Sequence, residues 1–129
     1  VLAYADRYDR AASYYRRALE QFQSIGSTRG MLDATLNIAD SYFELQDYAQ
    51  AEAFGRDALA QADSVGDPIR QSRALGTLAS VFARNGRVQE SNDTFDRLLV
   101  MAHSMSMPEM VAGALIQRAE FEAERGEVE

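Results

Sequence analysis

The chain has 129 residues, of which 47% are hydrophobic and 26% are charged, and this composition predicts one folded domain rather than a disordered chain. It contains no cysteine and no lysine, which excludes a disulfide scaffold, a cysteine nucleophile, thiolate zinc ligands, a P-loop lysine and a Schiff-base lysine. The net charge of −7 disfavours nucleic acids and anionic membranes as partners; the sequence also has no apolar run of about 20 residues and no signal-peptide pattern, so we expect a cytoplasmic location.

Apolar and small residues recur at alternating steps of three and four along six segments, and this spacing predicts six helices. Short breaks rich in glycine, proline and polar residues separate the segments. Asp67 before Pro68 is typical of a helix start, and Asn85 with Gly86 is typical of a helix end. The predicted helices cover residues 3–25, 29–45, 48–65, 68–85, 88–105 and 109–125.

The same landmarks return every forty residues, which is the mark of a repeat architecture. Small residues recur where neighbouring helices must approach closely, and large ones alternate with them: Ala11 and Ala51; Ala18 and Ala58; Ala39, Ala79 and Ala119. Because the breaks are only two to five residues long, consecutive helices must run antiparallel. The sequence therefore predicts an all-α solenoid of helical hairpins.

We expect a single domain over residues 1–129, composed of a half repeat, two complete repeats and a second half repeat: residues 1–27, 28–67, 68–107 and 108–129. In this arrangement the first and the last helix each lack a hairpin partner. We therefore expect either a longer array, of which this chain is a piece, or self-association through the terminal helices.

In the middle repeat an aromatic residue follows the turn, and alanines follow three and ten positions after it, at Tyr48, Ala51 and Ala58. The preceding helix carries Leu36, Asn37, Ile38, Ala39 and Tyr42. This pattern resembles the tetratricopeptide repeat family, in a variety with longer helices than the usual period of about 34 residues allows. HEAT-type repeats also have a period near forty residues and remain an alternative. The sequence departs from the pattern where apolar residues are expected, at Gly55, Arg118 and Glu122.

The resemblance implies that the first helix of each repeat lines a concave groove, which binds an extended peptide or a partner helix. Leu36, Phe43 and Ile116 are expected to form an exposed apolar floor. The candidate groove residues are Asp33, Leu36, Asn37, Asp40, Phe43, Glu44, Arg73, Gly76, Thr77, Ser80, Ala83, Arg84, Ile116, Gln117, Glu120 and Glu124. Five acids against two arginines in this set predict a basic or neutral partner.

Some tetratricopeptide domains hold a peptide carboxylate with a clamp of lysine, asparagine and arginine. Leu36 and Asp40 occupy the positions where that clamp has lysine and asparagine, so a receptor for chaperone tails is not expected. Gly55 and Gly76 lie inside predicted helices, where glycine costs about 1 kcal/mol relative to alanine. Each indicates either close packing against a large neighbour or a notch for a partner side chain.

Residues that carry catalysis or bind metals are few. His103 is the only histidine, and neither a nucleophile elbow nor an HExxH pair gives it a role. Met101, Met105 and Met107 lie near it, but helical spacing directs His103 away from Met101. The C-terminal glutamates lack the spacing of a calcium loop. We predict no catalytic residue, no cofactor and no metal site.

The sequence thus favours a non-catalytic protein–protein interaction module from a bacterial signalling or regulatory protein. Two alternatives remain: a peptide-sensing domain that switches an adjacent effector domain, and a structural module that self-assembles.

Overall fold

The computed structural model describes residues 2–128, with side-chain environments for residues 4–125. It contains six helices: α1 (Leu2–Ser24), α2 (Thr28–Glu44), α3 (Tyr48–Val65), α4 (Pro68–Arg84), α5 (Val88–Ser104) and α6 (Pro108–Val128). The predicted bounds are correct to within one residue except at the end of α6. Val1 and Glu129, the ends of the predicted domain, lie outside the described residues.

All five connections are the same tight turn. One residue in each adopts a left-handed conformation with φ between 53° and 75°: Gly26, Gln46, Gly66, Gly86 and Ser106. The N–H of the next residue then donates to the carbonyl five positions earlier at 2.8–3.1 Å, which is the Schellman arrangement that closes a helix. The left-handed residues are spaced by 20 residues, so the turns recur twice in each forty-residue period.

Three of the turns continue directly into a helix cap. The side chains of Ser27, Asp47 and Asp67 each accept a hydrogen bond from the backbone N–H three residues later, at 3.1–3.2 Å. These bonds satisfy amides that have no partner inside the helix. The Asp67–Pro68 start and the Asn85–Gly86 end are therefore confirmed.

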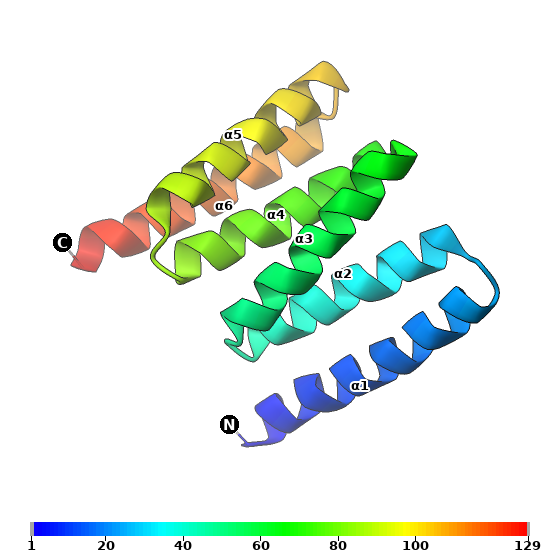
Figure 1. The fold of residues 1–129 in the computed structure, drawn as a ribbon. Helices are drawn as coiled ribbons and strands as arrows, with labels where there is room; N and C mark the ends of the chain where they lie inside the picture. The colour runs from blue at the N-terminus through cyan, green and yellow to red at the C-terminus, as the bar shows by residue number, and fades with distance from the viewer. Residues whose placement is uncertain (1, 129) are drawn as a thin grey trace.

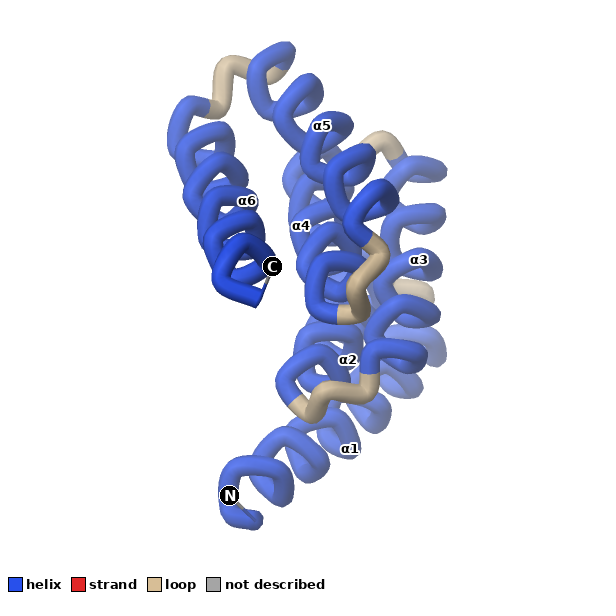
Figure 2. Tube along the Cα trace, turned by 90° about the vertical axis from the view of Figure 1, so that its left-hand side faces the viewer, coloured by secondary structure: helices blue, strands red, loops and turns tan. Residues whose placement is uncertain are grey.

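The helices form two layers that together make an antiparallel solenoid (Figures 1 and 2). In one layer the backbone of α4 approaches those of α2 and α6. In the other layer α3 and α5 stand farther apart and are joined by long charged side chains, such as Arg87 to Glu52 and Arg97 to Asp63. The all-α solenoid is confirmed. No helix in residues 2–128 is both long enough and apolar enough to cross a membrane.

Large and small residues exchange places between successive hairpins of the core. Leu36 is fully buried and packs against Ala58 and Ala74. Forty residues later, Gly76 replaces the leucine and Leu98 replaces the alanine, and the Leu98 Cδ2 atom lies 4.0 Å from where a Cβ on Gly76 would be. The summed side-chain volume is thus roughly conserved across the two contacts.

Most of the repeated alanines are buried as predicted, including Ala39, Ala51, Ala58 and Ala79. One prediction in the terminal helices is wrong, because Ala119 is exposed. Ala11 and Ala18 are half-buried. Within the described residues the backbone of α1 lies next to that of α2 alone, although the Arg16 guanidinium also lies 5.9 Å from the centroid of the Phe54 ring of α3. The helix α6 packs against α5 and α4, so each terminal helix lacks a neighbouring helix on one side.

Two glycines allow close approach between neighbouring helices. A Cβ on Gly55 would lie 3.0 Å from Cδ2 of the buried Leu78, which supports close packing rather than a notch. A Cβ on Gly30 would lie 2.2 Å from the Phe22 ring, because that ring of α1 rests directly on the α2 backbone. Gly76 has no such crowding.

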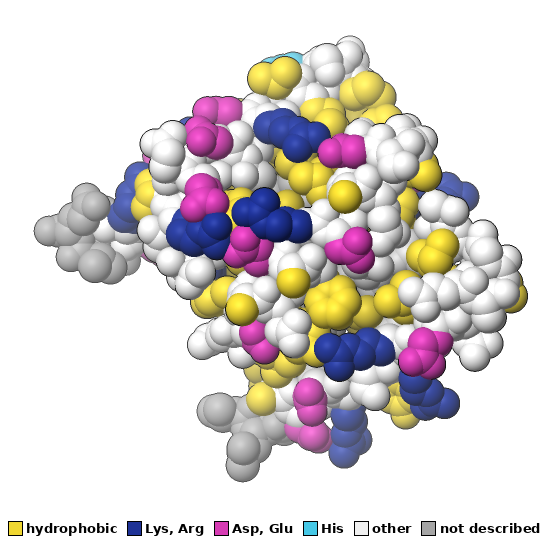
Figure 3. All heavy atoms as spheres, viewed as in Figure 1, with side chains coloured by type: hydrophobic (Ala, Val, Ile, Leu, Met, Phe, Trp, Pro, Cys, Tyr) yellow, Lys and Arg dark blue, Asp and Glu magenta, His cyan; other side chains and the backbone are white. Residues whose placement is uncertain are grey.

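Arginines bind two carboxylates at once at several junctions. Arg70 donates to both oxygens of Asp33 at 2.8 Å and to Asp67 at 2.9 Å. The hydrogen bonds from Arg70 hold the pKa of Asp33 below its ordinary value of 3.8, and the backbone N–H of Arg70 does the same for the pKa of Asp67. Figure 3 shows basic and acidic side chains next to one another on the face seen there.

We expect Gly30→Ala and Gly76→Ala to change stability in opposite directions. The methyl group at residue 30 would displace the Phe22 ring and lower the free energy of unfolding by about 1–3 kcal/mol. The methyl group at residue 76 meets only an ordinary contact, so the higher helix propensity of alanine raises the free energy of unfolding by up to about 1 kcal/mol. Urea denaturation measures both, and equal shifts would contradict the packing described here.

We expect acid to remove the stability that Asp33 contributes. A carboxyl group whose pKa is lower in the folded chain stabilises the fold above its unfolded pKa, and this contribution disappears as the pH falls through the folded pKa. Asp33→Asn should therefore lower Tm at about pH 7, and the gap in Tm from the wild type should close below about pH 4. Thermal melts of both proteins from about pH 7 to pH 3 test this. A gap that does not depend on pH would show that the ion pair adds nothing.

Candidate functional site

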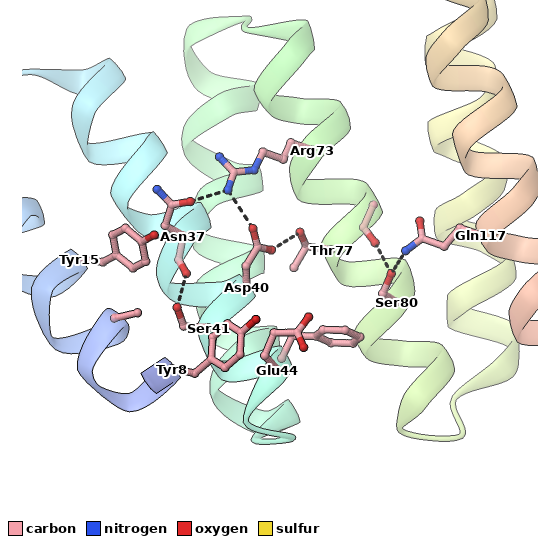
Figure 4. Close-up of a pocket in the computed structure, with 13 residues that line it drawn as sticks. Tyr8, Tyr15, Asn37, Asp40, Ser41, Glu44, Arg73, Thr77, Ser80 and Gln117 are labelled. Atoms are coloured by element: carbon pink, nitrogen blue, oxygen red, sulfur yellow. Dashed lines mark hydrogen bonds and ion pairs between the residues drawn. The ribbon is translucent and has the colours of Figure 1, made fainter. Parts of the chain in front are cut away.

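A hollow of about 520 Å³ lies on the layer formed by α2, α4 and α6 (Figure 4). We call it the groove. It extends from α1 across α2 and α4 to one residue of α6. Its lining consists of Tyr8, Ala11, Tyr15, Asn37, Asp40, Ser41, Phe43, Glu44, Arg73, Gly76, Thr77, Ser80 and Gln117.

Nine of the residues predicted from the sequence line the groove together: Asn37, Asp40, Phe43, Glu44, Arg73, Gly76, Thr77, Ser80 and Gln117. Those on α2 and α4 thus lie around one hollow, and their role in binding stays a prediction. Of the residues predicted on α6, only Gln117 lines the groove.

Leu36 does not belong to the groove, although it was expected to form part of an exposed floor. Its side chain is fully buried against α3 and α4, where it fills the space left by Ala58 and Ala74. Ile116, at the corresponding position of α6, is 61% exposed but lies outside the groove. The apolar floor is consequently wrong at Leu36, and Phe43 is the one predicted floor residue that lines the groove.

The remaining predicted residues lie elsewhere. The half-buried Asp33 pairs with Arg70, and the exposed Glu120 lies outside the groove. Ala83, Arg84 and Glu124 line a separate hollow of about 280 Å³ between α4, α5 and α6. The predicted strip is therefore divided between two hollows.

The sequence analysis missed four lining residues, Tyr8, Ala11, Tyr15 and Ser41. The first three follow one another at steps of three and four along α1, a spacing that by itself indicates a core-facing stripe. Because α1 is the terminal helix and no helix among the described residues covers its other side, one edge of this stripe faces the groove instead. The short connection after α1 is the signal that could have placed these residues beside α2. Ser41 donates its hydroxyl proton to the Asn37 carbonyl at 2.9 Å, which periodicity does not reveal.

One position of the forty-residue period carries a hydrogen-bonding side chain that lines the groove in all three copies, at Asn37, Thr77 and Gln117. The Asn37 Oδ1 atom accepts a hydrogen bond from Arg73 at 2.7 Å, and the Thr77 hydroxyl donates to Asp40 at 3.0 Å. The Gln117 amide nitrogen donates to the Ser80 Oγ atom at 2.5 Å. Each of these three side chains is therefore held in place by a residue on an adjacent helix of the same layer (Figure 4).

The same bonds determine which atoms remain available. Since the Asn37 oxygen faces a guanidinium, its NH₂ group points away from Arg73. The Ser80 hydroxyl donates to the Gly76 carbonyl at 2.9 Å and so accepts from the Gln117 nitrogen, which leaves the Gln117 oxygen free. Within residues 4–125 neither the Asn37 nitrogen nor the Gln117 oxygen has a protein partner. The groove thus offers both donors and acceptors.

Ion pairs neutralise most of the acids that the sequence placed in the binding strip. Arg70 pairs with Asp33 at 2.8 Å, Arg73 with Asp40 at 2.9 Å and Arg84 with Glu124 at 2.9 Å. These three acids contribute little net field to the groove. Of the five acids in the predicted strip, only Glu44 and Glu120 have no cationic partner in the part of the chain that the structure describes.

Glu44 is instead bonded to a tyrosine. The Tyr4 hydroxyl donates to its Oε2 atom at 2.6 Å, and this hydrogen bond to a carboxylate raises the pKa of Tyr4 above its usual range. Glu44 and its tyrosine partner lie at the end of the groove that α1 and α2 form.

Residues 2–128 contain no group of three His, Asp or Glu side chains arranged to hold a metal ion. His103 is exposed at the end of α5, beside an apolar hollow that includes Met107, Val111 and Leu115. It does not line the groove. The groove itself is suited to hydrogen bonding, ion pairing and contact with aromatic rings.

We expect serine substitutions at two corresponding positions to differ strongly in cost. Leu36→Ser removes a buried side chain and leaves a hydroxyl in the core, which lowers the free energy of unfolding by about 3 kcal/mol or more. Ile116→Ser changes an exposed position and should shift the free energy of unfolding by less than about 0.5 kcal/mol. Urea denaturation measures the free energy of unfolding of both variants. A Leu36→Ser variant as stable as the wild type would contradict the burial of Leu36.

Comparison with known proteins agrees with the repeat geometry. A search of curated proteins gives no match. The model of the family described as Tetratricopeptide repeat matches residues 1–64 and, in a second alignment, residues 30–102. This match favours tetratricopeptide repeats over the alternative of HEAT-type repeats. The chain belongs to the tetratricopeptide repeat family.

Proposed function

We propose that this chain is a non-catalytic binding module that holds an extended peptide in the groove. Tetratricopeptide repeats generally mediate protein–protein interactions and are generally not catalytic. The observation that carries the proposal is the line of hydrogen-bonding side chains at Asn37, Thr77 and Gln117, each oriented by a partner on a neighbouring helix.

An extended segment suits this lining better than a helix does. A helix satisfies its backbone internally and binds through an apolar face, which requires an apolar groove. The burial of Leu36 removes much of that surface, and the groove presents amides and hydroxyls instead. An extended peptide carries unpaired N–H and C=O groups, which the free Asn37 nitrogen and Gln117 oxygen can bind.

The charge of the partner remains part of the proposal. Of the five acids that suggested a basic or neutral partner, three form ion pairs with arginines, and Glu44 and Glu120 are left without one among the described residues. A weakly basic peptide is therefore favoured, chiefly through its rate of encounter and its register in the groove.

The biological setting is also part of the proposal. A role in a bacterial signalling or regulatory protein, the switching of an adjacent effector domain and a cytoplasmic location all stay predictions. Self-association through the terminal helices stays a prediction too; exposed Tyr14 and Leu115 are consistent with it.

The test begins with selection of binders from a displayed library of random dodecapeptides on the full chain. The affinity of the best peptide is then measured by calorimetry for the wild type and for a variant with Asn37→Ala and Gln117→Ala. Loss of two hydrogen bonds should weaken binding by about 30-fold.

The matched control combines Gln23→Ala and Gln50→Ala, which alter exposed amides of α1 and α3 outside the groove. The control should bind like the wild type, and circular dichroism should show that both variants remain folded. No selected peptide, or equal weakening by both pairs of substitutions, would refute binding in the groove.

A further inference from the structure

One end of the groove combines a carboxylate with two tyrosine rings. The Tyr4 hydroxyl donates to Glu44, and the Tyr4 and Tyr8 rings meet edge to face with their centroids 4.8 Å apart. Tyr8 and Glu44 both line the groove and lie near one another in Figure 4. Tyr4 holds the Oε2 atom, and within residues 4–125 the Oε1 atom of Glu44 has no hydrogen-bond partner.

Elsewhere in this chain the same combination of ring and carboxylate holds an arginine. The guanidinium of Arg87 lies 4.6 Å from the centroid of the Phe82 ring and donates to the Glu90 carboxylate at 2.6 and 2.8 Å. Attraction to the face of the ring and charge-assisted hydrogen bonds act on the same cation.

A second case involves the positions that correspond to Glu44. Residues 44, 84 and 124 occupy the same place in successive periods, as Glu44, Arg84 and Glu124. Arg84 lies 5.0 Å from the Phe121 ring centroid and donates to Glu124 at 2.9 Å. Arg84 thus pairs with α6, and no arginine of residues 4–125 pairs with Glu44.

We propose that Glu44, Tyr4 and Tyr8 form a subsite for one arginine side chain of the bound peptide. The guanidinium donates to the free oxygen of Glu44 and lies against the Tyr8 ring. This inference rests on the proposed function, because it assigns one side chain of the peptide that the groove holds.

Arginine fits this subsite better than lysine. Its planar guanidinium can stack on a ring and donate in the plane of a carboxylate at once, and it is less strongly hydrated than an ammonium group. The internal examples do not discriminate between the two, because the chain contains no lysine. The tyrosine bond that fixes the Glu44 carboxylate favours the directional donor.

The first experiment selects random dodecapeptides on three forms of the full chain: the wild type, Glu44→Gln and Glu120→Gln. Glu120→Gln is the matched control. It removes the same charge as Glu44→Gln does, but at an exposed residue that lies outside the groove. We expect arginine at one fixed position among peptides selected on the wild type and on the control. That enrichment should be absent with Glu44→Gln.

The second experiment uses the best peptide and its counterpart in which citrulline replaces the arginine, so that shape is kept and charge is lost. The arginine form should bind the wild type about tenfold more tightly, and Glu44→Gln should abolish the difference. Circular dichroism confirms that the variant remains folded.

The outcomes separate the two proposals. Selected peptides without a preferred arginine, or with a preference that survives Glu44→Gln, overturn the subsite while groove binding stands. Failure to select any peptide on the wild type overturns both.

Discussion

A left-handed residue at every twentieth position holds the six helices in register. It ends each helix with the same backbone hydrogen bond, and the next helix starts at once, so the four inner helices have 17 or 18 residues each. Equal lengths and identical turns bring corresponding residues of α2, α4 and α6 to the same height. Asn37, Thr77 and Gln117 form one line for this reason. The line depends on the turns, although none of its members touches them.

Ion pairs between neighbouring helices of the α2, α4 and α6 layer also decide which charges reach the groove. Each arginine that spans two helices neutralises a carboxylate that the sequence alone would leave free, as Arg73 does with Asp40. A strongly acidic chain thus presents a nearly balanced groove with one carboxylate lacking a cationic partner, at Glu44. Selectivity then depends on position more than on net charge.

The helices could be predicted because their ends carry local chemistry: Asp67 caps, Pro68 starts and Gly86 closes a helix without help from distant residues. The left-handed backbone of Gln46 could not be predicted, because glutamine rarely adopts this conformation and therefore does not indicate it. Leu36 was misplaced because its burial depends on the small residue opposite it, Ala58, which a position-by-position comparison does not consider. Tyr8 was missed because a periodic stripe does not tell how many neighbours a helix has.

The exchange of Leu36 and Ala58 for Gly76 and Leu98 makes the two hairpins different modules despite their shared outline. Recombination that joined the first half of one hairpin to the second half of the other would place two leucines together or leave glycine facing alanine, so one product would clash and the other would contain a void. Shuffling within this array is therefore constrained to whole hairpins, and each hairpin must diverge as a unit.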